Sequence, residues 1–369
     1  MTLDASSHER ENNFDLLRLA AAAVVLASHS FVVVGAAEPH VGHFPLGTLG
    51  VEIFFAISGF LVAKSWCFQP RLGAFVAKRG LRILPALLVT LLACALVLGP
   101  IVSSLSAGDY FGSLAAERYV VDNVASVVSA GVLVDVSHHL PGVFATNPKG
   151  SVNLSLWTLP IEVRAYVLVA LLGVAGLLRK GMPLAAAGFL ALSLTPGGFG
   201  GSALEFLRGA DGETAHLVAL FAVSALAWTW RVRISLRVDL AAAALAALVL
   251  SIGTPAERVV LLVAIPYLVL FLAYRSPGRL RVLTRHADVS YGLYLLAFPV
   301  QQTIVHAWAG SPPPPAVVAL IALPITYLLA LASWHGVEKR ALRLKGALAA
   351  PRTTRTRPDP ILNPQVEVS

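Results

Sequence analysis

The chain has 369 residues, of which 57% are hydrophobic and 13% are charged, and its formal net charge is +8. A soluble domain is roughly a quarter charged, and one globular core cannot hide so much apolar surface, so the composition excludes an ordinary soluble protein and predicts a membrane protein. The positive charges lie in short runs between apolar stretches, which is typical of membrane topology, so we expect membrane lipid around the chain and no nucleic-acid partner.

Apolar stretches of about 20 residues, the length that crosses the hydrocarbon of a bilayer, recur along the chain. We therefore predict an all-α fold, a polytopic membrane helical bundle of about ten transmembrane helices. Two of the expected spans, the fifth and the seventh, are short for a membrane crossing. The spans cover residues 14–34, 49–67, 81–103, 156–178, 182–198, 215–230, 238–253, 258–275, 289–309 and 316–336.

The distribution of Lys and Arg predicts the orientation of these spans. If residues 1–13 form a cytoplasmic N-terminus, most Lys and Arg fall in segments on that side, as the positive-inside rule requires, and both termini are cytoplasmic. We expect residues 14–346 to form the transmembrane domain and residues 347–369, rich in Arg, Thr and Pro, to form a disordered cytoplasmic tail. The largest segment on the opposite side, from about 104 to 155, is interpreted either as a lid or as a loop with an interfacial helix.

Ionisable side chains inside a span are costly, so each one is a candidate functional group. In the first span, Arg18 and His29 are eleven residues apart, so they share a helix face and are separated by about 16 Å along the axis. Arg18 can hold a phosphate or carboxylate, and His29 can accept a proton near neutral pH. Asp15 is placed to pair with Arg18. In the alternative, structural interpretation, His29 hydrogen-bonds a neighbouring helix and Arg18 extends to the surface.

The second and third spans carry further polar groups. Glu52 opens the second span and is expected to orient a histidine or to pair with an arginine, whereas the Ser58-Gly59 pair is more typical of close helix packing. At the start of the third span, Arg79 and Arg82 are three residues apart and share a helix face. They form either an anion clamp on the cytoplasmic side or an ordinary positive-inside anchor.

The fourth span combines an interfacial tryptophan, Trp157, with two opposite charges, Glu162 and Arg164. Because residues two apart on a helix do not face each other, the partners of these charges are expected on other helices. Tyr166 lies one turn beyond Glu162. A purely structural network remains the alternative. Most polar residues of the last two spans are interpreted as structural.

Taken in order, these stretches resemble the acyltransferase-3 family of integral-membrane O-acyltransferases, from about Asn12 to Arg340. The resemblance implies a ten-helix bundle in a bacterial inner membrane that takes an acyl group, often acetyl, from cytoplasmic acyl-CoA and places it on a sugar. Many members have a histidine in a late span where this chain has Ala297, so that residue is not carried over. The family motifs fall on Arg18 and His29, on Arg79, Arg82 and Pro85, and on Trp157, Leu159 and Glu162.

The resulting hypothesis is a membrane O-acyltransferase with acyl-CoA, acetyl-CoA in the first instance, as the donor substrate and a carbohydrate or glycolipid as the acceptor. No permanently bound cofactor and no metal are expected. His29 acts as the general base, oriented by Glu52 or Glu162; a covalent acyl-enzyme on His29 is the second route. The other candidates bind substrate: Arg18, Arg79 and Arg82 hold the CoA phosphates, and Ser58, Trp157 and Tyr166 contact the reacting molecules.

The competing hypothesis is a proton-coupled secondary transporter of a small anionic or sugar-like solute. The charged residues expected inside the bundle, His29, Glu162 and Arg164, would suit such a carrier. Carriers of this kind usually show inverted repeats, and the sequence has no recognisable repeat. Binding of CoA would discriminate the two hypotheses, because a carrier needs no CoA site. A structural or receptor-like protein would tolerate the loss of His29.

Overall fold

A computed structural model of the chain describes residues 2–7, 12–180, 212–276, 282, 284, 287–308 and 310–349. The described part is helical apart from one short hairpin, which pairs β1 (His40–Val41) with β2 (Phe44–Pro45) in antiparallel fashion. The prediction of an all-α fold is therefore confirmed.

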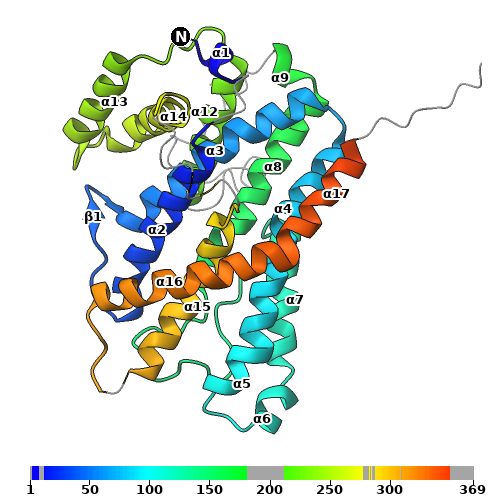
Figure 1. Ribbon diagram of the computed structural model, residues 1–369, viewed down its shortest axis with the longest axis vertical. Helices are drawn as coiled ribbons and strands as arrows, with labels where there is room; N and C mark the ends of the chain where they lie inside the picture. Colours follow the sequence, from blue (N-terminus) through cyan, green and yellow to red (C-terminus); the bar gives the residue numbers. More distant parts are fainter. Residues whose placement is uncertain are drawn as a thin grey trace, which may run out of the picture.

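The helices assemble into one bundle, with α3 passing through its middle against α2, α8, α12 and α14 (Figure 1). In chain order they are α1 (Leu3–Ser7), α2 (Phe14–Val33), α3 (Leu46–Phe68), α4 (Leu72–Leu92), the π-helical turn η1 (Ala93–Leu98), α5 (Gly99–Val102), α6 (Ala107–Gly112), α7 (Ala115–Val128), the 3₁₀ turn η2 (Leu154–Trp157), α8 (Thr158–Val174), α9 (Leu177–Lys180), α12 (Gly212–Thr229), α13 (Val238–Ser251), α14 (Glu257–Arg275), α15 (Ser290–Ala307), α16 (Pro315–Ser333), the π-helical turn η4 (Trp334–Glu338) and α17 (Lys339–Ala349).

Within the described residues, six helices are long and apolar enough to cross a membrane. The protein is thus an all-α membrane protein, but ten spans are not confirmed. The expected span at 182–198 lies outside the described residues, and the one at 238–253 is α13, which at 14 residues is shorter than a crossing requires. The six spans are Phe14–Val33, Leu46–Phe68, Leu72–Val102, Leu154–Val174, Glu257–Arg275 and Pro315–Leu344.

Two expected spans, α12 and α15, are full helices of 18 residues that carry too many polar groups to qualify. Several of their polar groups are buried in the bundle and form hydrogen bonds with neighbouring helices. In α15, the Nε2 atom of Gln301 donates to the Leu26 carbonyl oxygen at 2.6 Å and lies 2.7 Å from Ser30 Oγ. These two helices are enclosed by protein, so the apolarity that lipid demands does not apply to them.

Two glycines let α3 approach its neighbours closely. A Cβ atom on Gly59 would lie 2.2 Å from the Phe221 carbonyl oxygen of α12, and one on Gly50 would lie 2.8 Å from the Ala21 carbonyl oxygen of α2. Small residues at such contacts allow backbones to pack in direct contact, the usual mechanism of helix association in membranes. The packing role predicted for the Ser58-Gly59 pair is therefore confirmed for Gly59.

The start of the chain is fastened to one end of the bundle, at the top of Figure 1. Asp4 of α1 pairs with Arg231 at 2.6 Å, and Lys64 near the end of α3 donates to the Ser7 carbonyl oxygen at 2.8 Å. The N-terminal segment, the end of α3 and the segment after α12 therefore lie at the same end of the bundle, as expected from their assignment to one side of the membrane. That this end faces the cytoplasm stays a prediction. Helix α17 continues to Ala349, and residues 350–369 of the expected tail lie outside the described residues.

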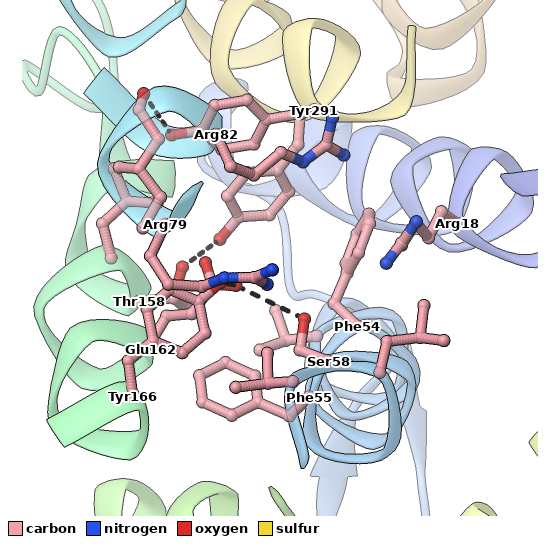
Figure 2. A pocket seen from close by; sticks show the side chains of 16 residues that line it. Arg18, Phe54, Phe55, Ser58, Arg79, Arg82, Thr158, Glu162, Tyr166 and Tyr291 are labelled. Carbon is pink, nitrogen blue, oxygen red and sulfur yellow. Dashed lines mark hydrogen bonds between the residues drawn. The ribbon is translucent and has the colours of Figure 1, made fainter. Parts of the chain in front are cut away.

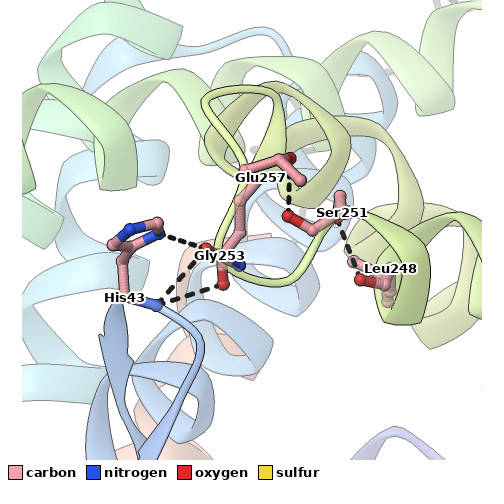
Figure 3. Close-up of polar contacts among 6 residues, drawn as sticks. His43, Leu248, Ser251, Gly253 and Glu257 are labelled. Carbon is pink, nitrogen blue, oxygen red and sulfur yellow. Dashed lines mark hydrogen bonds and ion pairs between the residues drawn. The ribbon is translucent and has the colours of Figure 1, made fainter.

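A carboxylate joins the β-hairpin to the turn between α13 and α14 (Figure 3). Glu257 accepts hydrogen bonds from the backbone N–H groups of His43 at 3.3 Å and Gly253 at 3.0 Å, and its Oε2 lies 2.5 Å from His43 Nδ1. One side chain therefore closes the helical turn and holds the hairpin against it. This cluster fastens α13 and α14 to the β-hairpin.

The segment between α5 and α8, expected as a lid or a loop, is largely tied down. Helix α7 packs along α4 and α8. Asn123 of α7 exchanges two hydrogen bonds with Ser137, at 3.0 and 3.1 Å, and Asn153 donates to the Leu295 carbonyl oxygen of α15 at 2.8 Å. The segment is thus an ordered part of the bundle wall that frames the start of α8.

Candidate functional site

A cavity lies between α2, α3, α4, α8 and α15 (Figure 2). Six of the nine residues proposed from the sequence line it, although they come from four separate helices. The cavity therefore brings together a set of residues that the sequence could only propose one helix at a time. The six are Arg18 of α2, Ser58 of α3, Arg79 and Arg82 of α4, and Glu162 and Tyr166 of α8.

Helix α8 supplies one polar wall of the cavity. Thr158, Glu162 and Tyr166 follow one another at intervals of four residues, so they project from one face. The Oε1 atom of Glu162 accepts hydrogen bonds from the Tyr166 hydroxyl and, at 3.3 Å, from the Ser58 hydroxyl of α3. The expectation that Glu162 finds a partner on another helix is confirmed, and the pairing fixes its carboxylate in the cavity.

Arg164 faces away from Glu162, as predicted. Its Nε atom donates to the Ala130 carbonyl oxygen, just beyond α7, at 2.7 Å. The two charges of α8 therefore serve different neighbours, and only Glu162 of this pair lines the cavity.

Helix α4 supplies two guanidinium groups, and their surroundings differ. Arg82 Nη2 pairs with Asp288 Oδ2 at 2.8 Å, and its guanidinium carbon lies 5.6 Å from the centre of the Tyr291 ring. Arg79 lies between the rings of Phe75 and Tyr166, 5.8 and 5.6 Å from their centres. The Nε of Arg79 is buried without a hydrogen-bond partner, and no described residue forms an ion pair with it. Arg79 is thus held by aromatic rings and keeps its charge free for a ligand.

Arg18 approaches the cavity from α2, on the side opposite the two arginines of α4 (Figure 2). Its Nη1 lies 3.2 Å from Asp15 Oδ1, so the predicted pairing with Asp15 is confirmed. Asp15 is half exposed, whereas the Arg18 side chain is only 16% exposed. Three guanidinium groups around one small space are a strong site for a phosphate or carboxylate, because each supplies a charge-assisted donor.

Asp288, which sequence analysis missed, counterbalances this positive charge. It lies just outside the expected ninth span, and Ser290 Oγ donates to its Oδ1 at 2.6 Å. Burial alone would raise the pKa of Asp288, but the charges of Arg82 and Arg18, together with these hydrogen bonds, lower the pKa to about 2. Asp288 therefore stays ionised and holds Arg82 in place. No signal in the sequence links it to Arg82, which lies on a distant part of the chain.

Two tyrosines of α15, a span whose polar residues the sequence mostly predicts to be structural, complete the cavity. The Tyr291 hydroxyl donates to the Ile83 carbonyl oxygen of α4 at 3.1 Å, and the Tyr294 hydroxyl lies 2.8 Å from Thr158 Oγ1. The Thr158–Tyr294 hydrogen bond joins α8 to α15 across one end of the cavity. The sequence does not predict that these rings line the cavity, because a tyrosine in a membrane span gives the same sequence signal whether it packs in the core or faces a binding site.

His29 does not line the cavity. It lies three turns beyond Arg18 on α2, half-buried, with its ring edge-on to Phe298 at 5.3 Å between centres. Phe298 is one turn beyond Tyr294 on α15, so His29 lies past the Thr158–Tyr294 hydrogen bond. Its Nδ1 is buried and has no hydrogen-bond partner among the described residues. His29 therefore packs on α15 one turn beyond Tyr294 and is not part of the cavity lining.

The prediction that Glu52 or Glu162 orients His29 is not met by this geometry. Glu52 is fully buried, and its Oε1 lies 2.9 Å from His216 Nε2 of α12, a histidine that sequence analysis did not consider. Glu162 is engaged by Ser58 and Tyr166. Which histidine a buried carboxylate meets depends on helix packing, and α12, not α2, presents its histidine to Glu52.

Trp157 also lies outside the cavity lining. It is the last residue of η2 and is half-buried against the hydrophobic core, directly before Thr158. It directly precedes α8, whose residues Thr158 and Glu162 line the cavity.

Comparison with known proteins identifies the family. The family model described as an acyltransferase domain, acyltransferase-3, matches residues 11–335. The chain belongs to the acyltransferase-3 family. An O-acetyl transferase of Shigella phage Sf6 is 30% identical over 351 residues, covering 90% of this chain and 96% of the relative. Nodulation protein 10 of Rhizobium leguminosarum bv. viciae is 28% identical over 381 residues, covering 94% and 97%. No solved structure matches the chain.

As a member of the acyltransferase-3 family, the protein is an acyltransferase. The family match favours the acyltransferase hypothesis over the competing hypothesis of a proton-coupled secondary transporter. The matched region contains α2 to α16 and all sides of the cavity. Of the motif residues, Arg18, Arg79, Arg82, Leu159 and Glu162 line this one site. His29, Pro85 and Trp157 are not part of its lining.

Proposed function

We propose that the protein is an O-acyltransferase that moves an acyl group, in the first instance acetyl, from acyl-CoA to a hydroxyl of a carbohydrate or glycolipid. The observation that carries the proposal is the convergence of Arg18, Arg79 and Arg82 on one cavity inside a membrane protein of the acyltransferase-3 family. A donor with several phosphates suits such a cluster, and the name of the phage relative, O-acetyl transferase, supports acetyl as the group.

In this proposal the CoA phosphates bind at the arginines from the cytoplasmic side. Arg79 makes the first contact, because it has no carboxylate partner in the described part of the chain, while Arg18 and Arg82 are already balanced by Asp15 and Asp288. The extended pantetheine arm then follows α2 towards His29. The distance along the helix axis is about 16 Å, from eleven residues at 1.5 Å each.

His29 acts as the general base. It takes the proton of the acceptor hydroxyl, and the hydroxyl oxygen attacks the thioester carbonyl; the carbon–sulfur bond breaks and CoA leaves as the thiolate. The Nδ1 atom, unpartnered among the described residues, is available for this proton. Because His29 lies past the Thr158–Tyr294 hydrogen bond, the thioester reaches it when that contact opens. A covalent acyl group on His29 is the second route.

Glu162 holds the polar side chains of α3 and α8 in position in the cavity wall. It binds the hydroxyl groups of Ser58 and Tyr166, and the Tyr166 ring in turn supports the Arg79 guanidinium. We assign this group to positioning Arg79 for the donor. Ser58 and Tyr166 thereby act on substrate binding through the cavity wall, and Trp157 acts through the start of α8.

The test uses the purified protein in nanodiscs with radiolabelled acetyl-CoA, following CoA release and transfer of the label. Wild type is compared with His29→Ala and Arg79→Ala, and with Arg237→Ala as a control, since Arg237 is 61% exposed and paired with Asp239 far from the cavity. We expect turnover in wild type and the control and its loss in the two site variants. Neither binding nor turnover of acetyl-CoA or longer acyl-CoAs would refute the proposal.

A further inference from the structure

The face of α2 that carries His29 packs against one face of α15. Leu26, His29 and Ser30 lie within one turn of each other at intervals of three and four residues, so they share this face. Phe298 and Gln301, three residues apart, share a face of α15. The Phe298 ring meets the His29 imidazole edge-on, and Gln301 binds the residues on either side of that histidine. His29 and Gln301 therefore belong to one contact between the two helices.

Gln301 binds the turn of α2 that carries His29. Its side chain is fully buried, and its Nε2 donates to the Leu26 carbonyl oxygen at 2.6 Å and to Ser30 Oγ at 2.7 Å. Ser30 Oγ donates its own proton to the Leu26 carbonyl oxygen at 3.0 Å, so it is free to accept from the amide. Because only the nitrogen of an amide can donate to a carbonyl oxygen, this pairing fixes which way the Gln301 amide points.

The amide oxygen of Gln301 and the Nδ1 atom of His29 are both left over at this contact. Each atom is buried and has no hydrogen-bond partner within the described part of the chain. A buried polar atom without a partner is costly, and native structures rarely keep one without a reason. An amide oxygen can only accept and a protonated ring nitrogen can only donate, so the two atoms become complementary once His29 takes up a proton at Nδ1.

We propose that Gln301 is a positioning residue for His29, and that its Oε1 accepts the Nδ1–H hydrogen bond when the ring has taken the proton of the acceptor hydroxyl. The inference rests on the proposed function, in which Nδ1 is the atom that takes this proton. Without such an oxygen, the protonated ring would hold an unsatisfied donor in a buried place. With it, the charge that develops on the ring during attack is stabilised by a group already in position.

An amide suits this role better than a carboxylate. Its oxygen is uncharged, so it accepts the hydrogen bond without holding the proton as tightly as a carboxylate would. When the carbon–sulfur bond breaks, the proton passes from Nδ1 to the thiolate sulfur, which gives the CoA thiol and returns His29 to its neutral form. Gln301 thereby takes the part that the sequence predicted for Glu52 or Glu162, both of which bind other side chains.

The experiment compares two neighbouring glutamines of α15. Gln301→Met and Gln302→Met each replace a fully buried amide by an unbranched apolar side chain and remove two donated hydrogen bonds. Gln302 donates to the carbonyl oxygens of Lys149 and Ser151, in the segment before α8, so its variant is the matched control. Each substitution is made in wild type and in His29→Ala, and acetyl-CoA turnover and the Kd for acetyl-CoA are measured in nanodiscs.

We expect Gln301→Met to lower turnover about 10- to 100-fold, the effect of one hydrogen bond to a charged group, at an unchanged Kd. Gln302→Met should turn over like wild type. In His29→Ala, Gln301→Met should cause no further loss, because a residue that acts through His29 has no effect once the imidazole is gone. Equal losses in the two glutamine variants, or the same loss from Gln301→Met with and without His29, would show a purely structural role and overturn the inference.

Ser30→Ala is the second variant, used if Gln301→Met does not fold. It removes one hydrogen bond that holds the Gln301 amide, so turnover should fall, again only while His29 is present, and normal turnover would overturn the inference. Wild type without turnover, or a His29→Ala enzyme of normal rate, would refute the proposed function itself. Turnover that is lost in His29→Ala and normal in Gln301→Met would overturn this inference alone.

Discussion

Arg79 and Arg82, one helical turn apart, should respond in opposite ways when each is replaced by alanine. Arg82 is paired with Asp288, and both side chains are mostly buried, at 19% and 16% exposed. Removing one partner of a buried ion pair costs about 3–5 kcal/mol, because the other charge is left unpaired in a poor solvent. The remaining exposure places Arg82→Ala near the lower end, at about 3 kcal/mol of unfolding free energy.

Arg79→Ala removes a guanidinium that no described carboxylate balances. The free energy of unfolding should change little, because the lost contacts with the rings of Phe75 and Tyr166 offset the relief of an unpaired charge, while the donor loses a charged partner. A hydrogen bond to a charged group contributes about 1.5–3 kcal/mol, which corresponds to a roughly 10- to 150-fold increase in the Kd for acetyl-CoA.

The assay combines thermal unfolding in detergent with acetyl-CoA binding by calorimetry for both variants. The double variant Arg82→Ala/Asp288→Asn is the control, since removing both charges of the pair should restore most of the lost stability. A destabilised Arg79→Ala with normal binding, or an Arg82→Ala as stable as wild type, would show that the charges of the cavity are not distributed as described.

Three further predictions concern the base, the core and the pH dependence. His29→Ala should lower turnover about 10²- to 10⁴-fold with the Kd for acetyl-CoA nearly unchanged, as radiolabel transfer and calorimetry would show. Gly59→Ala should cost about 1–3 kcal/mol in thermal unfolding, because its Cβ meets the Phe221 carbonyl oxygen, whereas Gly73→Ala, with open space around it, should not destabilise. The low pKa of Asp288 means that its ion pair stabilises the folded state above about pH 4 and is lost as pH falls towards 2, so the stability difference from Asp288→Asn should be constant at neutral pH and shrink in acid.

Each of these three predictions would be contradicted by a specific result. A His29→Ala enzyme of normal rate would remove the base from the mechanism. Equal stability of the two glycine variants would mean that α3 and α12 have room to separate. A stability difference for Asp288→Asn that vanishes already between pH 8 and pH 5 would place its pKa far above the value that its arginine neighbours impose.

Local periodicity was enough to predict parts of the site that lie on one helix. The three-residue interval of Arg79 and Arg82 and the four-residue interval of Glu162 and Tyr166 put each pair on one face, and both faces line the cavity. Arg18 was found from the cost of a charge in a span. These signals depend only on helix geometry, which is fixed once a helix forms.

Partners across helices could not be predicted in the same way. Asp288 was passed over because it lies in a short connection, and the carboxylate of Glu52 was assigned to the wrong histidine, since His216 is its partner. The span count suffered from a related cause: α12 and α15 are enclosed by other helices, so their hydropathy does not follow the rule for lipid-facing segments. Tertiary packing decides these contacts.

The hydrogen bond between Thr158 and Tyr294 has a consequence for the membrane as an electrical insulator. A charged cavity inside a bilayer endangers the ion gradient, because buried charges invite water inward. The two hydroxyl groups satisfy each other, and behind them Phe298 belongs to a small buried apolar cluster with Val33, Val305 and Val318. We expect that, while this hydrogen bond is formed, the hydroxyl pair and the apolar cluster behind it hinder water and ions from crossing the bundle beyond the charged cavity.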